Sequence, residues 1–203
     1  FAFFYGFMRR TPALRIWYVI AFSLYFYYKS SGIYLLLLVG VSVSDFWIGR
    51  AIAHVGSRRA QRALVALSIA ADLAVLGYFK YTNFFIEIAR DLFGAGFLEF
   101  QNIFLPVGIS FFLFQSLSYT IDIYRGSLKP VDRWGDYLFY LSFFPQLVAG
   151  PIVRARDFLV QIRQNPIAVS REMFGTGIYL ITIGLFKKAV ISDYISLNFV
   201  DRI

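Results

Sequence analysis

A set of polar side chains recurs at helical spacing within an otherwise apolar stretch. Residues 103–121 carry no charged side chain, yet Gln115, Ser118, Tyr119 and Asp122 follow one another at positions i, i+3, i+4 and i+7. Residues at this spacing fall on one face of a helix. Lipid cannot hydrogen-bond such groups, so this face must meet protein or water. Two interpretations stay open: the side chains tie neighbouring helices together, or they line a cavity that holds a substrate.

A second apolar stretch is too short to cross a membrane. Residues 137–149 would rise about 20 Å as a helix, whereas the hydrocarbon core is about 30 Å thick. Pro145, beside Gln146, removes a backbone donor, and Gly150 with Pro151 favours a turn. Irregular backbone at membrane depth is tolerated only where protein or water surrounds it. The sequence therefore predicts a re-entrant segment that forms one wall of a cavity.

The basic loops predict the same topology. The loops 9–15, 49–62 and 123–136 are rich in arginine and lysine, whereas 81–102 is mainly acidic. Basic loops stay on the cytoplasmic side. The loop 150–171 is basic as well, so the segment between the last two basic loops must enter and leave the membrane on one side.

Several charged residues could carry chemistry, each with a simpler structural explanation. Asp122 and Arg125 can pair along one helix. Arg154 could contact an anionic donor or a lipid phosphate, or only anchor the chain. Carboxylates within spans are candidates for function; we expect Asp45 to pair near Arg50 and Asp72 to form a structural polar contact.

The composition excludes a soluble fold and several kinds of site. Hydrophobic residues make up 59% of the chain and charged residues 16%, against roughly a quarter charged in soluble domains. There is no cysteine and only one histidine, His54, so we expect no disulfide and no metal site. No glycine-rich phosphate loop is present, and we expect no cofactor. The net charge of +8 indicates cytoplasmic arginines rather than nucleic-acid binding.

These features predict an all-α, polytopic membrane bundle that forms one domain over residues 1–203. The expected helices are 1–8, 14–28, 32–48, 62–80, a short interfacial helix 83–93 before a turn at 94–96, then 103–123, the re-entrant 137–149, and 171–200 broken at Lys187 and Lys188. The abrupt ends suggest a chain truncated on both sides.

Four segments resemble one known family. They are Leu105-Pro106-Val107-Gly108-Ile109-Ser110-Phe111-Phe112, Gln115-Ser116-Leu117-Ser118-Tyr119-Thr120-Ile121-Asp122-Ile123-Tyr124-Arg125-Gly126, Ser142-Phe143-Phe144-Pro145-Gln146-Leu147-Val148-Ala149-Gly150-Pro151-Ile152-Val153-Arg154 and Gly184-Leu185-Phe186-Lys187-Lys188. Together they are similar to the membrane-bound O-acyltransferase family, in its alginate O-acetyltransferase branch. The segment around Pro145 to Pro151 is the most specific of them.

The resemblance implies a bacterial inner-membrane enzyme that takes an acyl group from a cytoplasmic donor. The acceptor would be a hydroxyl of an extracytoplasmic polysaccharide such as alginate, reached directly or through an acyl-relay protein. The family's catalytic histidine has no match here, since His54 lies elsewhere. We expect it beyond residue 203, so these residues alone would be inactive. The site residues that carry over are Tyr119, Asp122, Arg125, Pro145, Gln146, Gly150, Pro151 and Arg154, to which the polar stripe adds Gln115 and Ser118.

Three alternatives remain at this stage. One is acyl or D-alanyl transfer to a cell-wall polymer, which shares the fold. Another is a transporter, although transporters usually show paired broken helices in two related halves. A third is a membrane scaffold without catalytic activity.

Overall fold

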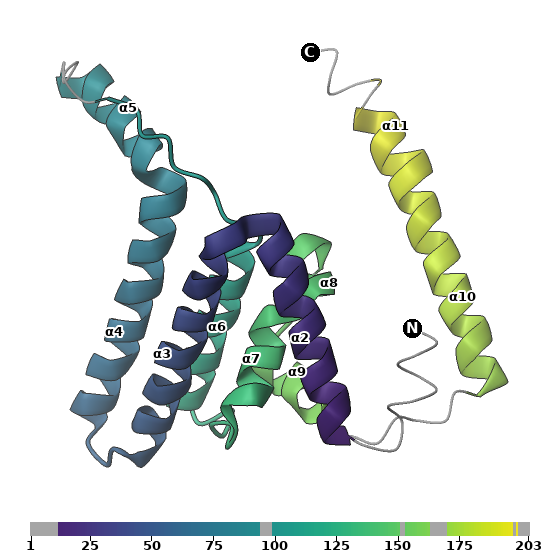
Figure 1. Ribbon diagram of the computed structural model, residues 1–203, viewed down its shortest axis with the longest axis horizontal. Coiled ribbons are helices and arrows are strands. Elements are labelled where there is room, and N and C mark those ends of the chain that lie inside the picture. Colours follow the sequence, from purple (N-terminus) through teal and green to yellow (C-terminus); the bar gives the residue numbers. More distant parts are fainter. Residues whose placement is uncertain (1–11, 94–98, 151–152, 163–169, 197, 199–203) are drawn as a thin grey trace. The chain divides into compact units, whose positions relative to one another are not determined.

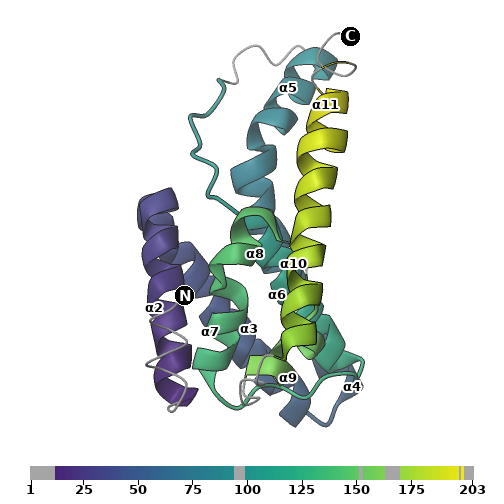
Figure 2. The same ribbon diagram turned by 90° about the vertical axis from the view of Figure 1, so that its right-hand side faces the viewer.

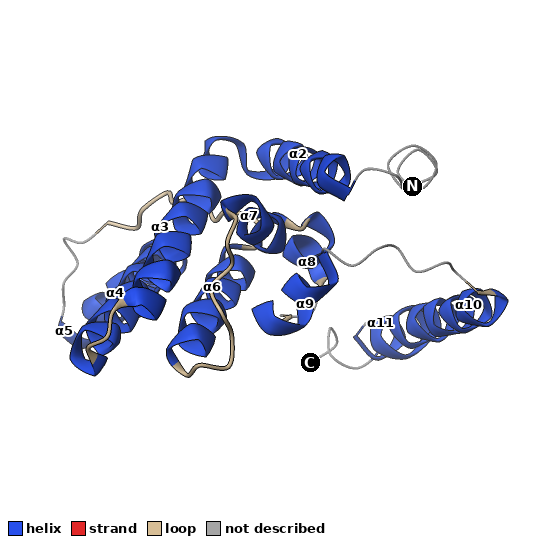
Figure 3. Ribbon diagram, turned by 90° about the horizontal axis from the view of Figure 1, so that it is seen from below, coloured by secondary structure: helices blue, strands red, loops and turns tan. Residues whose placement is uncertain are grey.

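The computed structural model describes residues 12–93, 99–150, 153–162, 170–196 and 198, and every described element is a helix (Figure 3). The chain forms two compact units, residues 1–164 and 165–203. The first contains α2 (Pro12–Ser31), α3 (Leu35–His54), α4 (Arg58–Leu76), α5 (Thr82–Phe93), α6 (Ile109–Tyr124), α7 (Trp134–Ser142), α8 (Phe144–Ala149) and α9 (Ala155–Ile162), shown in Figure 1. The second contains α10 (Arg171–Phe186), η3 (Lys187–Ser192) and α11 (Asp193–Ile195).

Within the described residues, three helical stretches are long and apolar enough to cross a membrane: Ile16–His54, Arg58–Phe93 and Arg171–Ile195. The first contains both α2 and α3, which are joined by the short helix η1 (Gly32–Tyr34). Gly32 has φ +57°, a conformation that side-chain-bearing residues rarely adopt. The chain reverses there, so α3 runs back alongside α2 (Figure 1). The predicted all-α, multi-pass membrane fold is confirmed.

Three predicted helix boundaries are wrong. The helix expected at 103–123 begins only at Ile109, because Gly108 has φ +71° and Pro106 lacks the amide that a preceding turn would need. The helix expected to end at 48 continues to His54. The separate interfacial helix 83–93 is instead a continuation of α4 into α5 through the π-helical turn η2 (Gly77–Tyr81).

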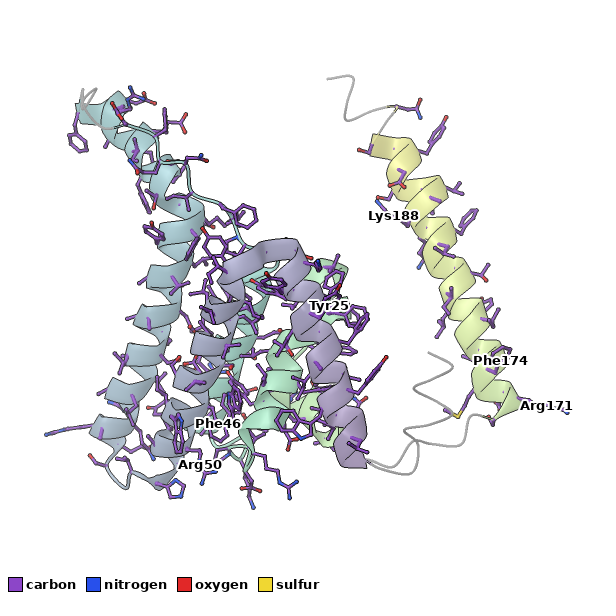
Figure 4. The ribbon with its side chains drawn as sticks, viewed as in Figure 1. Tyr25, Phe46, Arg50, Arg171, Phe174 and Lys188 are labelled. Atoms are coloured by element: carbon purple, nitrogen blue, oxygen red, sulfur yellow. The ribbon has the colours of Figure 1, made fainter. Side chains whose placement is uncertain are left out.

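The fourth difference lies in the second unit, taken by itself. The helix there does not break at Lys187 but passes through the π-helical turn η3 into α11. Lys188, labelled with Arg171 and Phe174 in Figure 4, donates to Asp193 Oδ1 at 2.6 Å. This pair spans five residues, so it stabilises the turn locally. The predicted turn at 94–96 and the first predicted helix, 1–8, lie outside the described residues.

The segment that the sequence predicts to be re-entrant folds back on itself in the structure. Helix α7 begins where α3 ends, with Arg50 donating to the carbonyl oxygen of Asp132 at 3.2 Å. Helix α8 follows α7 after a break at Phe143, and α9 then lies beside α7 (Figures 1 and 2). Residues of the 128–136 loop and of α9 line one hollow. The two basic loops that flank the segment therefore lie at the same end of the bundle.

Helix α6 forms the centre of the first unit. It packs against α3, α4, α7, α8 and α9, and its buried residues are both apolar and polar. At Gly49 the backbone of α3 approaches it so closely that an added Cβ would lie 2.8 Å from Tyr119 Cε1 and 2.9 Å from Ile123 Cδ1. The absence of a side chain at Gly49 is what allows this approach.

We expect Gly49→Ala to lower the free energy of unfolding by about 1–3 kcal/mol, because two buried side chains must move to admit one methyl group. Gly40→Ala is the matched control: it lies on the same helix, and nothing lies within 4 Å of its Cβ position. Alanine favours a helix over glycine by about 1 kcal/mol, so the control should be stabilised slightly. Thermal unfolding in detergent should show a lower unfolding temperature for Gly49→Ala and a slightly higher one for Gly40→Ala. A loss of stability in both variants would contradict the close approach.

Candidate functional site

Helix α6 and the re-entrant segment meet through a pair of buried amides. Gln115 is 1% exposed and Gln146 is 9% exposed, and Gln115 Nε2 donates to Gln146 Oε1 at 2.8 Å. Gln146 reaches this position because α8 begins with Pro145 in its first turn, which suits the missing amide of proline. Gln115 Oε1 is buried without a partner. The sequence placed both glutamines among the candidates, and the structure brings them together.

Tyr140 of α7 connects the residues that follow Gly150 with helix α6. Its hydroxyl donates to the carbonyl oxygen of Val153 at 2.8 Å and lies 3.5 Å from Ser118 Oγ. Gly150 stands at the turn, where an added Cβ would lie 2.5 Å from the Cα of Gln146. The turn is thus closed too tightly to accept a side chain.

Tyr119 holds helices together and does not line an open space. It is fully buried, its ring centroid lies 4.4 Å from that of Tyr137, and its hydroxyl accepts the backbone N–H of Val131 at 3.3 Å. Its ring also packs on the backbone of Gly49. Of the two interpretations of the polar stripe, these contacts favour the structural one at this position.

The remaining candidates are placed apart from one another. Asp122 is 7% exposed and one of its carboxylate oxygens has no partner; among the described residues no ion pair joins it to Arg125, so the pairing expected along the helix does not form. Arg125 and Arg154 are both exposed. Pro145 contacts an apolar hollow of about 420 Å³ between α2, α7 and α8, lined largely by phenylalanines. Pro151 lies outside the described residues.

Among the described residues, buried polar atoms without partners occur on α2 and α4, as the Tyr27 hydroxyl and Asp72 Oδ2, as well as on α6 and α7. Within the described part of the chain they include Gln115 Oε1, Asp122 Oδ2 and Ser142 Oγ. A buried polar atom without a partner is costly, and such atoms often mark a place where water or a ligand completes the contact. Of these atoms, Gln115 Oε1 lies at the contact between α6 and α8.

The sequence predicts a structural polar contact at Asp72 but not the buried polar cluster to which it belongs, which is centred on Asp45. Asp45 is 1% exposed, and its two oxygens accept from Ser68 Oγ at 2.7 Å and from Ser116 Oγ at 2.5 Å. Ser116 Oγ in turn lies 2.7 Å from the hydroxyl of Tyr137. Asp72 lies beside Asp45 and keeps one oxygen without a partner. The cluster joins α3, α4, α6 and α7.

This arrangement corrects the expected role of Asp45. The carboxylate does not reach toward Arg50; it points into the bundle and binds serines of two other helices. Arg50 lies at the lower end of α3 in Figure 4 and stacks over the Phe46 ring at 5.7 Å. The presence of two aspartates in membrane spans was the available signal, because an unpaired carboxylate in lipid would be very costly.

Comparison with known proteins decides the family. The chain is 38% identical over 165 residues to the probable alginate O-acetylase AlgI of Pseudomonas aeruginosa, which covers 79% of this chain and 31% of the relative. It is 35% identical over 162 residues to the protein of the same name from Azotobacter vinelandii, covering 77% of this chain and 32% of the relative. A peptidoglycan O-acetyltransferase of Helicobacter pylori is 32% identical over 204 residues, covering 88% of this chain and 38% of the relative. The chain belongs to the membrane-bound O-acyltransferase family.

The family assignment confirms the resemblance inferred from the segments between Leu105 and Lys188. The chain spans about one third of the length of the curated relatives it matches. No family model matches it, and no solved structure matches it.

Proposed function

We propose that the complete protein transfers acetyl groups to hydroxyls of an extracytoplasmic polysaccharide, from within the bacterial inner membrane. The observation that carries this proposal is the similarity to proteins named alginate O-acetylase and peptidoglycan O-acetyltransferase over roughly four fifths of the chain. In this proposal residues 1–203 belong to one membrane domain. The acyl donor binds from the cytoplasmic side, and a polysaccharide or an acyl-relay protein receives the group outside.

The chemistry assigns different tasks to different parts of the protein. A base takes the proton from the acceptor hydroxyl, so that its oxygen attacks the acyl carbonyl. We do not assign this role to His54, because it lies exposed at the end of α3, with its Nδ1 2.7 Å from the carbonyl oxygen of Arg50, and not on the wall of α6 and α8. The proposal places the base in the family's histidine-bearing region, which His54 does not match.

The wall of α6 and α8 supplies position and polarity in this proposal. The amide groups of Gln115 and Gln146 are fixed against each other, and pre-positioned donors lower the free energy of a developing oxyanion. The partner-free Gln115 Oε1 is available to accept from a bound substrate. Arg154 is exposed immediately before α9, where it can contact an anionic donor.

The acceptor polymer has two supported candidates. Alginate follows from the names of the Pseudomonas and Azotobacter relatives, and peptidoglycan from the Helicobacter relative. The O-acetyl content of each purified polymer, from cells with and without the complete protein, distinguishes them. D-alanyl transfer would instead leave an amine-bearing ester, which the same chemical analysis separates from acetate.

We expect Gln146→Leu in the complete protein to reduce polymer O-acetylation by about 10- to 100-fold, since loss of one positioned polar contact costs about 1.4–2.8 kcal/mol of transition-state stabilisation. Gln161→Leu is the matched control: Gln161 is exposed on α9 and donates only to Asp157 of its own helix, at 2.9 Å. Membrane abundance of each variant must be measured beside activity. Full acetylation by Gln146→Leu would remove the glutamine pair from the mechanism, whereas no acetylation by the unaltered complete protein would overturn the function itself.

A further inference from the structure

A polar hollow lies at the end of the bundle where α3 ends, α4 begins and α6 ends. It has a volume of about 340 Å³. We call it the arginine hollow and define it by Gly56, Arg58, Gln61, Tyr124, Arg125 and Gly126, which line it together with apolar neighbours. Nothing lies within 4 Å of the Cβ position of either glycine, so both open onto free space. None of these residues belongs to the wall of α6 and α8 that carries the proposed acyl transfer.

The hollow is held in a fixed shape by Gln61. Its Nε2 donates to the carbonyl oxygens of Ile52 at 3.1 Å and of Val55 at 2.9 Å, two groups left without partners where α3 ends. Its Oε1 accepts from Arg58 at 3.3 Å. One side chain therefore fastens the turn between α3 and α4 and orients the guanidinium beside it.

Tyr124 is the second fixed point. Arg58 donates to its carbonyl oxygen at 3.2 Å and lies over its ring, 5.4 Å from the centroid. Arg62 donates from Nε to its hydroxyl at 3.2 Å. Both hydrogen bonds of Arg58 leave from Nη1, so its Nε and Nη2 donors stay available. A guanidinium that is already ordered loses little entropy when it binds a ligand.

Among the described residues, no acidic side chain pairs with the positive charge of the hollow. Arg58, Arg62 and Arg125 form no ion pair with any described residue. The first turn of α4 begins at Arg58 without a side-chain cap from Ser57, and its free amides add positive potential at the same place. Two arginines, Arg58 and Arg125, line the hollow, and Arg62 bonds to the hydroxyl of its Tyr124. This arrangement fits an anion, because guanidinium groups bind phosphate oxygens with strong, directional hydrogen bonds.

The position of the hollow points to a lipid as the source of the phosphate. It lies at an end of membrane-crossing helices, at the level where headgroups lie, and the adjoining surface of α4 exposes Leu67 and Leu73 at 58% and 48%. Basic pockets between membrane helices bind anionic headgroups. We propose that the arginine hollow binds the phosphate of an anionic phospholipid, whose acyl chains lie along the exposed apolar side of α4.

The test uses the complete protein in nanodiscs of pure phosphatidylcholine or of phosphatidylcholine with phosphatidylglycerol. Native mass spectrometry counts the lipids retained, and thermal unfolding measures their effect on stability. We expect phosphatidylglycerol to be retained and to raise the unfolding temperature, and Arg58→Gln to weaken its binding about ten-fold. Arg125→Gln should do the same; the guanidinium of Arg125 forms no hydrogen bond with described residues, so this variant keeps the fold if Arg58→Gln does not.

The matched control is Arg59→Gln, which removes the same charge from the neighbouring position. Arg59 is exposed and does not line the hollow, and its side chain forms no hydrogen bond, ion pair or ring contact with described residues. If Arg59→Gln weakens lipid binding as much as Arg58→Gln, the attraction is diffuse surface charge and the site does not exist. If inorganic phosphate displaces the lipid and stabilises the protein equally well in phosphatidylcholine alone, the ligand is a soluble phosphate and the lipid assignment is wrong.

Discussion

Replacing Asp45 by alanine is expected to lower the free energy of unfolding by about 2–5 kcal/mol. The change removes the acceptor of two hydroxyl donors, Ser68 and Ser116, which are both fully buried. A buried donor that loses its partner costs about 1–3 kcal/mol. The hydroxyl of Tyr137, which bonds to Ser116, loses the orientation of its own partner as well. Thermal unfolding in detergent measures the loss.

Two further variants test the cause of that loss. Asp45→Asn keeps one acceptor oxygen, so it should be destabilised less than the alanine variant. Asp91→Ala makes the same chemical change on an exposed side chain of α5 and should alter stability by no more than about 0.5 kcal/mol. Equal effects at positions 45 and 91 would show that the buried hydrogen bonds of Asp45 do not stabilise the bundle.

Gly108→Ala should be about as damaging, at about 2–5 kcal/mol, for two separate reasons. Gly108 has φ +71°, where a side chain costs about 1–2 kcal/mol. Its Cβ would also lie 2.7 Å from the carbonyl oxygen of Leu147, and overpacking typically costs a further 1–3 kcal/mol. Because Leu147 follows Gln146, we also expect polymer acetylation by the complete protein to fall as α8 moves away from Gln115.

Gly126→Ala separates these two causes. Gly126 has φ +74° but nothing within 4 Å of its Cβ position, so it should suffer only the backbone cost of about 1–2 kcal/mol. The difference between the two variants measures the contact between the start of α6 and α8. No difference would mean that α8 yields freely at this point.

The re-entrant segment could be predicted from the sequence because its causes are local. A short stretch of sequence contains all of them: the apolar length, Pro145, Gly150 and the charge of the adjoining loops. Each limits what the backbone can do in lipid. The start of α6 was equally local, since Pro106 and Gly108 both stand before Ile109. The predicted helix began too early because residues 103–108 are largely apolar, and hydropathy carries no information on backbone conformation.

The partners of Asp45 could not be predicted in the same way. Ser68 and Ser116 are 23 and 71 residues away along the chain, and only the packing of three helices brings them together. A rule based on spacing within one helix found Arg50 instead, five positions further on. Tyr119 shows the same limitation: its place on a polar stripe was visible, but its burial against Gly49 depends on how α3 and α6 approach.

The order of the helices along the chain has a consequence for biogenesis. Helix α7 is enclosed by α2, α3 and α6, and all three leave the ribosome before it. Lipid cannot satisfy the irregular backbone of the short, proline-containing hairpin. The hairpin is synthesised after α2, α3 and α6, against which it packs. Insertion of this hairpin thus becomes a docking step onto helices that precede it in the chain, and α9, which follows it, adds the remaining contact with α7.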